Sequence, residues 1–192
     1  MSRSKSPSKP SARDRIMQTA STLFYQEGVH TVGIDRIIAE SGVAKMSLYN
    51  HFKSKDALIA AWLEQRDANW REWFQKTVEK KATDPVERLF AMFDALEEWF
   101  SQPDFRGCAF INSSIELVDA EHPGYRVAID HQQAIYDYIL QLVNAAEIAN
   151  PEVVGEQLLL LVEGAIVVAM MRRQPAAATH AKAAATMLIR GT

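Results

Sequence analysis

The segment over residues 31–58, TVGIDRIIAESGVAKMSLYNHFKSKDAL, constrains the fold more than any other part of the chain. An isoleucine stripe predicts a short helix over residues 34–41, and a second short helix is expected over 45–51. The turn between them contains Gly42, and glycine readily ends a helix in the left-handed conformation. Two short helices joined this tightly are typical of a helix-turn-helix, whose second helix enters the DNA major groove.

The rest of the chain also shows helical periodicity, without convincing alternation of period two. A first helix is expected from Ala12 to Gly28, and Ser54 is the expected N-cap of a long helix up to residue 82. Five further helices are predicted. The first begins at 84–85, the second spans 105–118, and the third follows a turn at 122–124. The fourth runs from 150 to 173 and the fifth from 175 to 189. We therefore expect an all-α fold of about nine helices, divided into a three-helix head and a helical body.

The run GVAKMSLYNHFKSKDAL is similar to the signature of the tetracycline-repressor (TetR) family, whose pattern is Gly-Val-Ser-Lys-x-Thr/Ser-Leu-Tyr-x-His/Tyr-Phe-x-Ser/Asn-Lys-x-x-Leu. The resemblance covers residues 12–60. It implies a homodimeric, ligand-responsive transcription repressor with a three-helix DNA-binding head and an all-α body. Such a homodimer is expected to bind a palindromic operator and to be released from it by a small, largely apolar effector.

Charge is unevenly distributed along the chain. Residues 1–55 carry a net charge of +5 and the remainder carries −8, within a formal total of −3. A basic segment ahead of an acidic one indicates that only the first meets a polyanion such as DNA, although chance clustering on a solvated surface gives the same counts. The expected domains are a disordered basic arm over 1–11, a helix-turn-helix DNA-binding domain over 12–56, and a ligand-binding and dimerisation domain over 57–192.

The second helix of the motif carries most of the expected DNA contacts. By the resemblance, Lys45, Tyr49 and Lys55 bind phosphates. Ser47 and Asn50 carry groups that can hydrogen-bond base edges, and such contacts specify sequence whereas phosphate contacts position the protein. The full set of expected DNA-binding residues is Thr31, Lys45, Met46, Ser47, Tyr49, Asn50, His51 and Lys55.

Two positions depart from the family pattern. Ala44 stands where the family has Ser or Thr, so the helix over 45–51 lacks a side-chain cap worth about 1 kcal/mol. Met46 stands where Gly is commonest, and its flexible apolar side chain can contact a thymine methyl group. Packing within the head is the alternative role for Tyr49 and His51.

The body is rich in aromatic residues, and its four tryptophans lie between residues 62 and 99. Core packing is the default role of such residues, and an apolar ligand pocket between bundle helices is the functional alternative. The candidate pocket residues are Trp70, Trp73, Phe93, Phe110, Asn112, Glu116 and His131. With His122, the polar members of this set fit a satisfied buried network, a ligand anchor or a metal site. A metal is not expected, because the sequence shows no tight ligand spacing such as HExxH.

The last two helices are expected to form the dimer. The predicted interface is an apolar stripe of Leu158, Leu161, Val162, Ala165 and Ala169. A two-fold axis makes such a stripe self-complementary and gives a four-helix interface with the alanine-rich segment over 176–185. The alternative is that the stripe faces the core of its own body, and both can hold because this helix is apolar around most of its circumference.

Several functional classes are disfavoured. The single cysteine, Cys108, excludes a disulfide framework and a cysteine-based zinc site, and it suits a reducing cytosol. No catalytic or phosphate-binding motif is recognisable, so neither an enzyme nor a cofactor is expected. No bilayer-spanning run or secretory signal is expected, which predicts a cytoplasmic protein without a membrane partner. An architectural DNA-binding protein without a ligand would leave the large aromatic body unexplained.

Overall fold

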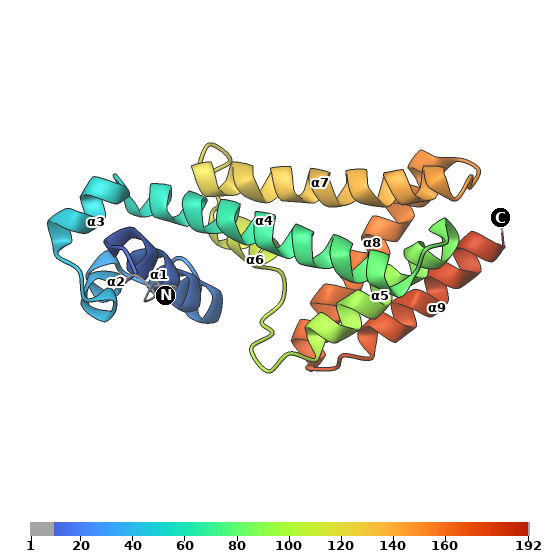
Figure 1. Ribbon diagram of the computed structural model, residues 1–192, viewed down its shortest axis with the longest axis horizontal. Helices are drawn as coiled ribbons and strands as arrows, with labels where there is room; N and C mark the ends of the chain where they lie inside the picture. The colour runs from blue at the N-terminus through green and yellow to red at the C-terminus, as the bar shows by residue number, and fades with distance from the viewer. Residues whose placement is uncertain (1–9, 192) are drawn as a thin grey trace, which may run out of the picture.

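The computed structural model describes residues 10–191, and every regular element in that range is an α-helix. The helices are α1 (Ala12–Glu27), α2 (Ile34–Ser41), α3 (Lys45–His51), α4 (Lys55–Lys81), α5 (Pro85–Phe100), α6 (Ala109–Glu116), α7 (Pro123–Ala145), α8 (Pro151–Arg172) and α9 (Ala177–Arg190). The molecule is elongated, with α1–α3 forming a head at one end (Figure 1). These nine helices of the described residues confirm the predicted all-α fold. The expected basic arm over 1–11 lies almost wholly outside the described residues.

Local sequence signals determine where the helices of the head begin and end. Ser11 and Asp14 form a reciprocal capping box at the start of α1. Gly42 ends α2 with a φ of 63°, a left-handed conformation that turns the chain toward α3. Leu48 of α3 is fully buried and Phe52 nearly so, and they fix the second helix of the helix-turn-helix on the head core. The predicted bounds of α2 and α3 are confirmed.

One uninterrupted helix connects the head to the body. α4 contains 27 residues and begins behind Ser54, whose side chain accepts from the Ala57 N–H. At ~1.5 Å per residue it is about 40 Å long. Near its start α4 packs on α1, where the indole Nε1 of Trp62 donates to Ser21 Oγ at 3.2 Å. Farther along, α4 lies beside α7 in the body (Figure 1).

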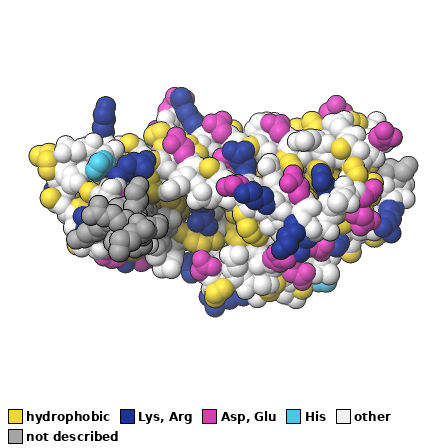
Figure 2. All heavy atoms as spheres, viewed as in Figure 1, with side chains coloured by type: hydrophobic (Ala, Val, Ile, Leu, Met, Phe, Trp, Pro, Cys, Tyr) yellow, Lys and Arg dark blue, Asp and Glu magenta, His cyan; other side chains and the backbone are white. Residues whose placement is uncertain are grey.

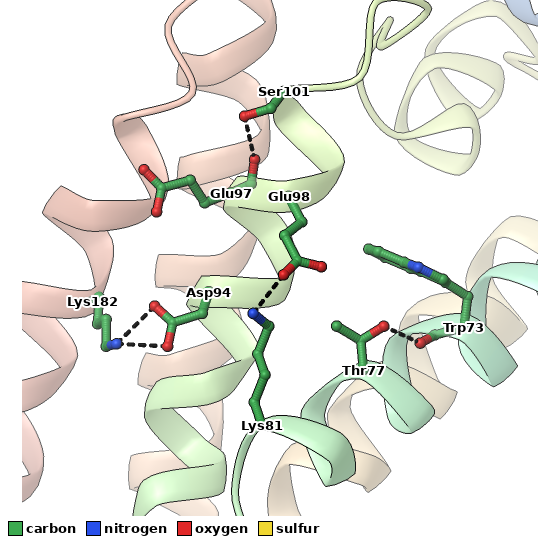
Figure 3. A network of polar contacts seen from close by, with 8 residues as sticks. All are labelled: Trp73, Thr77, Lys81, Asp94, Glu97, Glu98, Ser101 and Lys182. Atoms are coloured by element: carbon green, nitrogen blue, oxygen red, sulfur yellow. Dashed lines mark hydrogen bonds and ion pairs between the residues drawn. The ribbon is translucent and has the colours of Figure 1, made fainter.

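The body is a helical bundle with an aromatic and aliphatic core. α4 packs against α5 and α7, α7 packs against α8, and α9 covers both α5 and α8. Polar pairs tie the outer faces together: Lys182 of α9 donates to both Asp94 oxygens of α5 at 2.7 Å, and Lys81 pairs with Glu98 at 2.5 Å (Figure 3). These pairs are partly exposed, so burial of side chains such as Phe93 supplies more of the stability than ion pairing does.

The predicted helix over 105–118 is too long, and its bounds are corrected to those of α6, Ala109–Glu116. Gly107 has a φ of 84°, and its carbonyl oxygen accepts from the Tyr25 hydroxyl of α1 at 3.0 Å. The residues before α6 therefore form a loop that contacts the head instead of a further helical turn. At the other end, Leu117 has a φ of −89° and a ψ of 78°, so it leaves the helical conformation.

The expected turn at 122–124 is the beginning of α7. His122 is the N-cap, with its Nδ1 accepting from the Gly124 N–H at 3.0 Å, and Pro123 follows at the start of the helix. Histidine is not among the preferred capping residues, so the pattern predicted a turn without recognising the cap. His122 Nε2 also lies 3.2 Å from Asp56 of α4. The predicted bounds of the helices over 12–28, 54–82, 150–173 and 175–189 are confirmed to within two residues at each end.

α8 is long and apolar enough, by length and composition alone, to cross a membrane. It is the one described helix with these properties, and 39% of its most apolar window is buried inside the molecule. α8 packs against both α7 and α9, so part of its apolar surface belongs to the core of the body. One such helix is weak support for a membrane span, and the exposed remainder of its apolar surface is available to a partner.

Candidate DNA interface and ligand cavity

The outer face of α3 presents polar and flexible side chains. Met46 is 71% exposed and Tyr49 is 40% exposed, whereas Leu48 between them faces the core. The predicted DNA-binding residues that are exposed are Thr31, Lys45, Met46, Tyr49, Asn50 and His51, and those that are partly buried are Ser47 and Lys55. The structure therefore gathers the predicted residues on α3 and its flanks, at the head end of the molecule (Figure 1).

The two lysines of this surface have weak partners. Lys45 Nζ lies 3.2 Å from Asp35 of α2, and both side chains are strongly exposed. Lys55 Nζ donates to the His30 carbonyl oxygen at 3.4 Å. Because exposed ion pairs contribute only about 0–1 kcal/mol, either ammonium group can exchange its partner for a phosphate oxygen. On the face of the body in Figure 2, acidic and basic side chains are interspersed, which favours the head as the DNA-binding part.

Arg36 of α2 has a structural role in the head that the sequence did not indicate. Its guanidinium donates to Glu27 of α1 at 2.5 and 2.8 Å and to Glu40 of α2 at 2.7 Å. These hydrogen bonds, with Glu27 first, raise the pKa of Arg36, and the bond to Arg36 lowers the pKa of Glu27. Arg36 therefore joins α1 to α2, and its guanidinium is hydrogen-bonded to two carboxylates.

A second contact, besides α4, joins the head to the body. The Tyr25 hydroxyl of α1 donates to the Gly107 carbonyl oxygen at 3.0 Å and accepts from the Arg106 N–H at 2.9 Å. The Arg106 guanidinium donates to the Gln26 carbonyl oxygen at 2.9 Å. The Arg66 guanidinium of α4 lies 3.7 Å from the centroid of the Tyr25 ring. The end of α1 is therefore held by both α4 and the loop before α6.

Glu116, the last residue of α6, belongs to this contact. Its Oε2 accepts from the His30 N–H at 2.8 Å, and its carbonyl oxygen lies 2.7 Å from His30 Nε2. Gly28, with a φ of 89°, passes so close that an added Cβ would lie 2.8 Å from Glu116 Oε1. Asn112 Nδ2, one turn earlier, donates to the Arg106 carbonyl oxygen at 3.0 Å. Asn112 and Glu116 of α6 therefore both form hydrogen bonds at the contact between the head and the body.

An open cleft of about 760 Å³ borders this contact. Its mostly polar lining comes from the end of α1, the loop after α5, α6 and the end of α8. Asn112 and Glu116 line this cleft, while His131 lines a separate cavity. The structure thus corrects the prediction that these three side chains share one ligand pocket, because α6 presents Asn112 and Glu116 toward the head.

The separate cavity lies inside the body among α4, α5, α6, α7 and α8, and side chains nearly fill it. Its free volume is about 20 Å³, roughly the room that one water molecule needs. Three residues of the predicted pocket line it, namely Trp70, Phe110 and His131. Among the lining residues that were not predicted are Arg66, Trp99, Gln132 and Glu163.

A histidine–carboxylate pair stands beside this cavity. His131 Nδ1 lies 2.7 Å from Asp67 Oδ1, and Asp67 also accepts two hydrogen bonds from Arg71 at 2.7 and 2.8 Å. Since an ionised carboxylate can only accept, His131 Nδ1 is the donor, which leaves Nε2 of the neutral ring as an acceptor. The Phe110 ring stacks on the imidazole, with the two centroids 3.6 Å apart.

The protonation states of these groups follow from burial and hydrogen bonding. Burial lowers the pKa of His131, and the hydrogen bond with Asp67 opposes this effect without cancelling it. Burial raises the pKa of Asp67, but hydrogen bonds from Arg71 and His131 outweigh it, so the pKa is lowered. Burial raises the pKa of the Cys108 thiol to about 11, which keeps it protonated and unreactive at neutral pH.

The remaining predicted pocket residues lie outside the cavity. Trp73 borders an outer cleft of about 340 Å³ between α4 and α5, which shares Trp70 and Trp99 with the cavity. Phe93 is 1% exposed and belongs to the bundle core. Across residues 10–191, no three His, Cys, Asp or Glu side chains are grouped so that they could hold a metal ion.

The apolar stripe predicted for the dimer interface faces mainly the core of its own body, which is the alternative role that the sequence left open for it. Leu158, Val162, Ala165 and Ala169 are at most 5% exposed, and Leu161 is partly buried. Large apolar side chains remain exposed elsewhere on α8 and α9, and these are Val153, Leu160, Val168, Met171 and Met187. Because α8 is apolar on most sides, periodicity did not determine which face points outward.

Two family models match the chain. Residues 16–62 match the model described as bacterial regulatory proteins, tetR family. Residues 85–185 match the model of a tetracyclin repressor-like C-terminal domain. The first match covers most of the head and the first turns of α4, and the second covers the body from α5 into α9.

Similar known proteins are transcriptional regulators. The solved structure of a TetR-family transcriptional regulator from Streptomyces coelicolor is 31% identical, covers 94% of this chain and 95% of its own, and has a TM-score of 0.87. The HTH-type transcriptional regulator YjdC of Escherichia coli is 21% identical over 80% of this chain and 81% of its own length. The HTH-type transcriptional repressor KstR2 of Mycolicibacterium smegmatis is 34% identical over 50% of this chain and 49% of its own.

Proposed function

The chain belongs to the tetracycline-repressor family of DNA-binding transcriptional regulators, which are not enzymes, and from this premise we propose that it is a ligand-released repressor. It binds a palindromic operator as a homodimer in the cytoplasm, and a small, largely apolar effector weakens that binding. The observation that carries the proposal is the exposed polar face of α3, on a head that contacts the body both through α4 and through α6.

On the operator, α3 lies in the major groove with Leu48 and Phe52 turned inward. Ser47 and Asn50 hydrogen-bond base edges, and Met46 packs on a thymine methyl group. Phosphate contacts are made by Thr31, Lys45, Tyr49, His51 and Lys55. The weak present partners of Lys45 and Lys55 support this role for the two lysines, because exchanging those partners for phosphates loses little.

The homodimer forms through the exposed apolar face of α8 and α9. Leu160, Met171 and Met187 are each at least 68% exposed, and the burial of such side chains supports a stable interface. Gly164 of α8 has open space where a Cβ would stand, which allows a partner helix to approach closely. The two recognition helices must then lie about 34–36 Å apart to reach successive major-groove turns.

Ligand binding is coupled to the head through two helices. The cavity among Trp70, Phe110 and His131 is nearly full, so a ligand that enters it moves lining side chains such as Trp70 of α4 and Phe110 of α6. α4 carries Trp62, bonded to the head, and α6 carries Glu116, which holds His30. A coupling free energy of about 1–3 kcal/mol is enough to change operator affinity by several-fold to about a hundredfold.

The proposal is tested with DNA that flanks the protein's own coding region. Palindromes from that region are labelled and titrated with purified protein at several salt concentrations, and the mass of the complex is measured by sedimentation. We expect one dimer, near twice 21.6 kDa, on each palindrome. A monomer that binds as tightly, or the absence of any preference over scrambled DNA, contradicts the proposal.

A further inference from the structure

Glu163 is the acidic residue that interrupts the apolar run of α8, and this half-buried side chain lines the small cavity of the body. Its Oε1 is buried and has no hydrogen-bond partner. The indole Nε1 of Trp70, another lining residue, is also buried without a partner. Buried polar atoms are nearly always hydrogen-bonded in proteins, so two unpartnered atoms on one cavity are unusual. A hydrogen-bond donor that enters the cavity can supply the missing partner of Glu163 Oε1.

The unpartnered carboxylate oxygen needs a donor. Burial raises the pKa of Glu163, and a hydrogen bond from Gln132 opposes this rise while the charge of Glu156 adds to it. A positively charged donor would relieve both the desolvation and the repulsion, since a carboxylate binds a charged donor about twice as strongly as a neutral one. The neutral His131 ring adds a second acceptor to the same cavity, because its Nδ1 proton is committed to Asp67.

The remaining walls suit a flat ring with a positive charge. Trp70 and Trp99 meet edge to face with centroids 5.3 Å apart, and Phe110 lies against the stacked His131 ring. Aromatic faces attract cations because their π-electrons make the face negative, and tryptophan does so most strongly. The one cationic side chain of the described lining, Arg66, has its guanidinium over the Tyr25 ring at 3.7 Å, on the head side of α4.

We propose that this cavity binds a planar aromatic cation whose N–H group donates to Glu163 Oε1. The inference rests on the proposed function, because it names the chemical class of the effector. It refines the small, largely apolar effector of that proposal by adding a positive charge, and it identifies Glu163 of α8 as the acidic anchor, which the sequence alone did not indicate.

The ligand enters past Trp70. The outer cleft of about 340 Å³ and the small cavity of the body share Arg66, Trp70 and Trp99, so these side chains form the wall between them. Since the Trp70 indole N–H has no partner, turning this ring breaks no hydrogen bond. Movement of Trp70 joins the two spaces and makes room for two or three fused rings.

The test compares ligands that share a ring system and differ in charge. 9-Aminoacridine and 4-aminoquinoline are cations at neutral pH, and acridine and quinoline are their neutral counterparts. Each is titrated by calorimetry into the full-length protein, into Glu163→Gln and into Glu152→Gln. Glu152 is an exposed glutamate in the first turn of the same helix, so it is the matched control. Thermal melting checks that Glu163→Gln folds, and its stability should equal or exceed that of the wild type, because a carboxylate whose charged form is disfavoured by burial is removed.

We expect at least one cation to bind the wild type about tenfold or more tightly than its neutral counterpart. Glu163→Gln should abolish this preference, and Glu152→Gln should retain it. The proposal is overturned if neither cation binds better than its counterpart, or if the preference survives in Glu163→Gln.

A parallel titration of the operator separates this inference from the proposed function. If the cations bind in a Glu163-dependent way and leave operator affinity unchanged, the ligand class stands and ligand release is wrong. If neutral or anionic aromatic compounds release the operator and the cations do not bind, ligand release stands and the ligand class is wrong.

Discussion

Phe110 and Glu116 lie near the two ends of α6 and contact different parts of the molecule. Phe110 stacks on His131 beside the small cavity of the body, with ring centroids 3.6 Å apart, and Glu116 accepts from the His30 N–H of the head at 2.8 Å. α6 has only eight residues, so about 12 Å of rigid helix separates its ends at ~1.5 Å per residue. We therefore expect displacement of Phe110 to disturb the contact that holds the head.

Removal of the Glu116 carboxylate should loosen the head. In Glu116→Ala, the His30 N–H loses a charge-assisted hydrogen bond, and such bonds contribute about 1.5–3 kcal/mol. We expect amide hydrogen exchange over residues 25–30 to become about tenfold faster. Glu121→Ala is the control, because Glu121 is exposed and pairs with Arg126 outside the junction. Unchanged exchange in Glu116→Ala would mean that α4 alone holds the head.

Substitution by alanine should change the free energy of unfolding differently at two glycines of the head. An added Cβ at Gly28 would lie 2.8 Å from Glu116 Oε1, and its φ of 89° is unfavourable for any other residue. Gly33 has a φ of −84° and nothing within 4 Å of an added Cβ. Gly28→Ala should therefore lower the free energy of unfolding by about 1–3 kcal/mol, while Gly33→Ala changes it little.

Urea denaturation measures both changes. Combining Gly28→Ala with Glu116→Ala should destabilise by less than the sum of the two single effects, because the clash disappears with the side chain. Strict additivity would show that the effect of Gly28→Ala comes from backbone strain and not from the contact with Glu116.

Lys45 should contribute to DNA binding without determining its sequence preference. Lys45→Ala should weaken binding to all sequences and reduce the slope of log affinity against log salt by about one ion. Its present ion pair with Asp35 is too exposed for its loss to destabilise the head. Lys80→Ala, an exposed lysine at the far end of α4, is the control. Equal salt slopes for the two variants in fluorescence anisotropy titrations would exclude a phosphate contact by Lys45.

Two charged substitutions on α8 should separate dimerisation from folding. Leu160→Glu places a charge on the exposed face, where the side chain is 68% exposed, and should yield a folded monomer. Ala165→Glu places a charge in the core of the body, where the residue is 5% exposed, and should unfold the protein. Sedimentation and circular dichroism distinguish these outcomes. A dimeric Leu160→Glu protein would place the interface elsewhere.

Stability should fall as the pH drops below the ordinary titration range of histidine. The pKa of His131 is lowered in the folded protein, mainly by burial, so the unfolded chain binds a proton first. The stabilising contribution is complete above about pH 6.5 and is lost as the pH falls toward the folded-state pKa. His131→Gln should flatten the decline in melting temperature between about pH 7 and 5. His180→Gln, at an exposed position on α9, should leave the decline unchanged.

The helix-turn-helix was predictable because its signals are local. Gly42 and Ser54 end and begin helices through their own backbone or side chain, so α2, α3 and the start of α4 follow from neighbours in sequence. The junction of Tyr25 with Gly107 joins residues 82 positions apart, and no local pattern encodes such a pairing. That long-range contact is also why α6 is shorter than its periodicity predicted.

The helices of the body were predictable from the sequence, but which face of each helix is buried was not. The stripe from Leu158 to Ala169 was assigned to the dimer, but a helix that is apolar on most sides has no pattern that distinguishes inside from outside. His131 was recognised as a candidate, whereas its partner Asp67 lies 64 residues away on α4. Glu163 was visible as an interruption of an apolar run, and only the surrounding helices reveal that its Oε1 has no partner.

A cavity with about 20 Å³ of free space can take up a ligand only in those molecules in which it has opened, so ligand binding depends on the fraction of open molecules. When only a fraction of the molecules is open, the apparent dissociation constant rises by the inverse of that fraction. Under the proposed ligand release, the packing of Trp70 against Trp99 should therefore help to set the effector concentration at which the protein leaves its operator, separately from the contacts that select the compound. Substitutions that loosen this packing would shift the dose–response curve of the regulated genes to lower concentrations, while the order of preference among compounds stays the same.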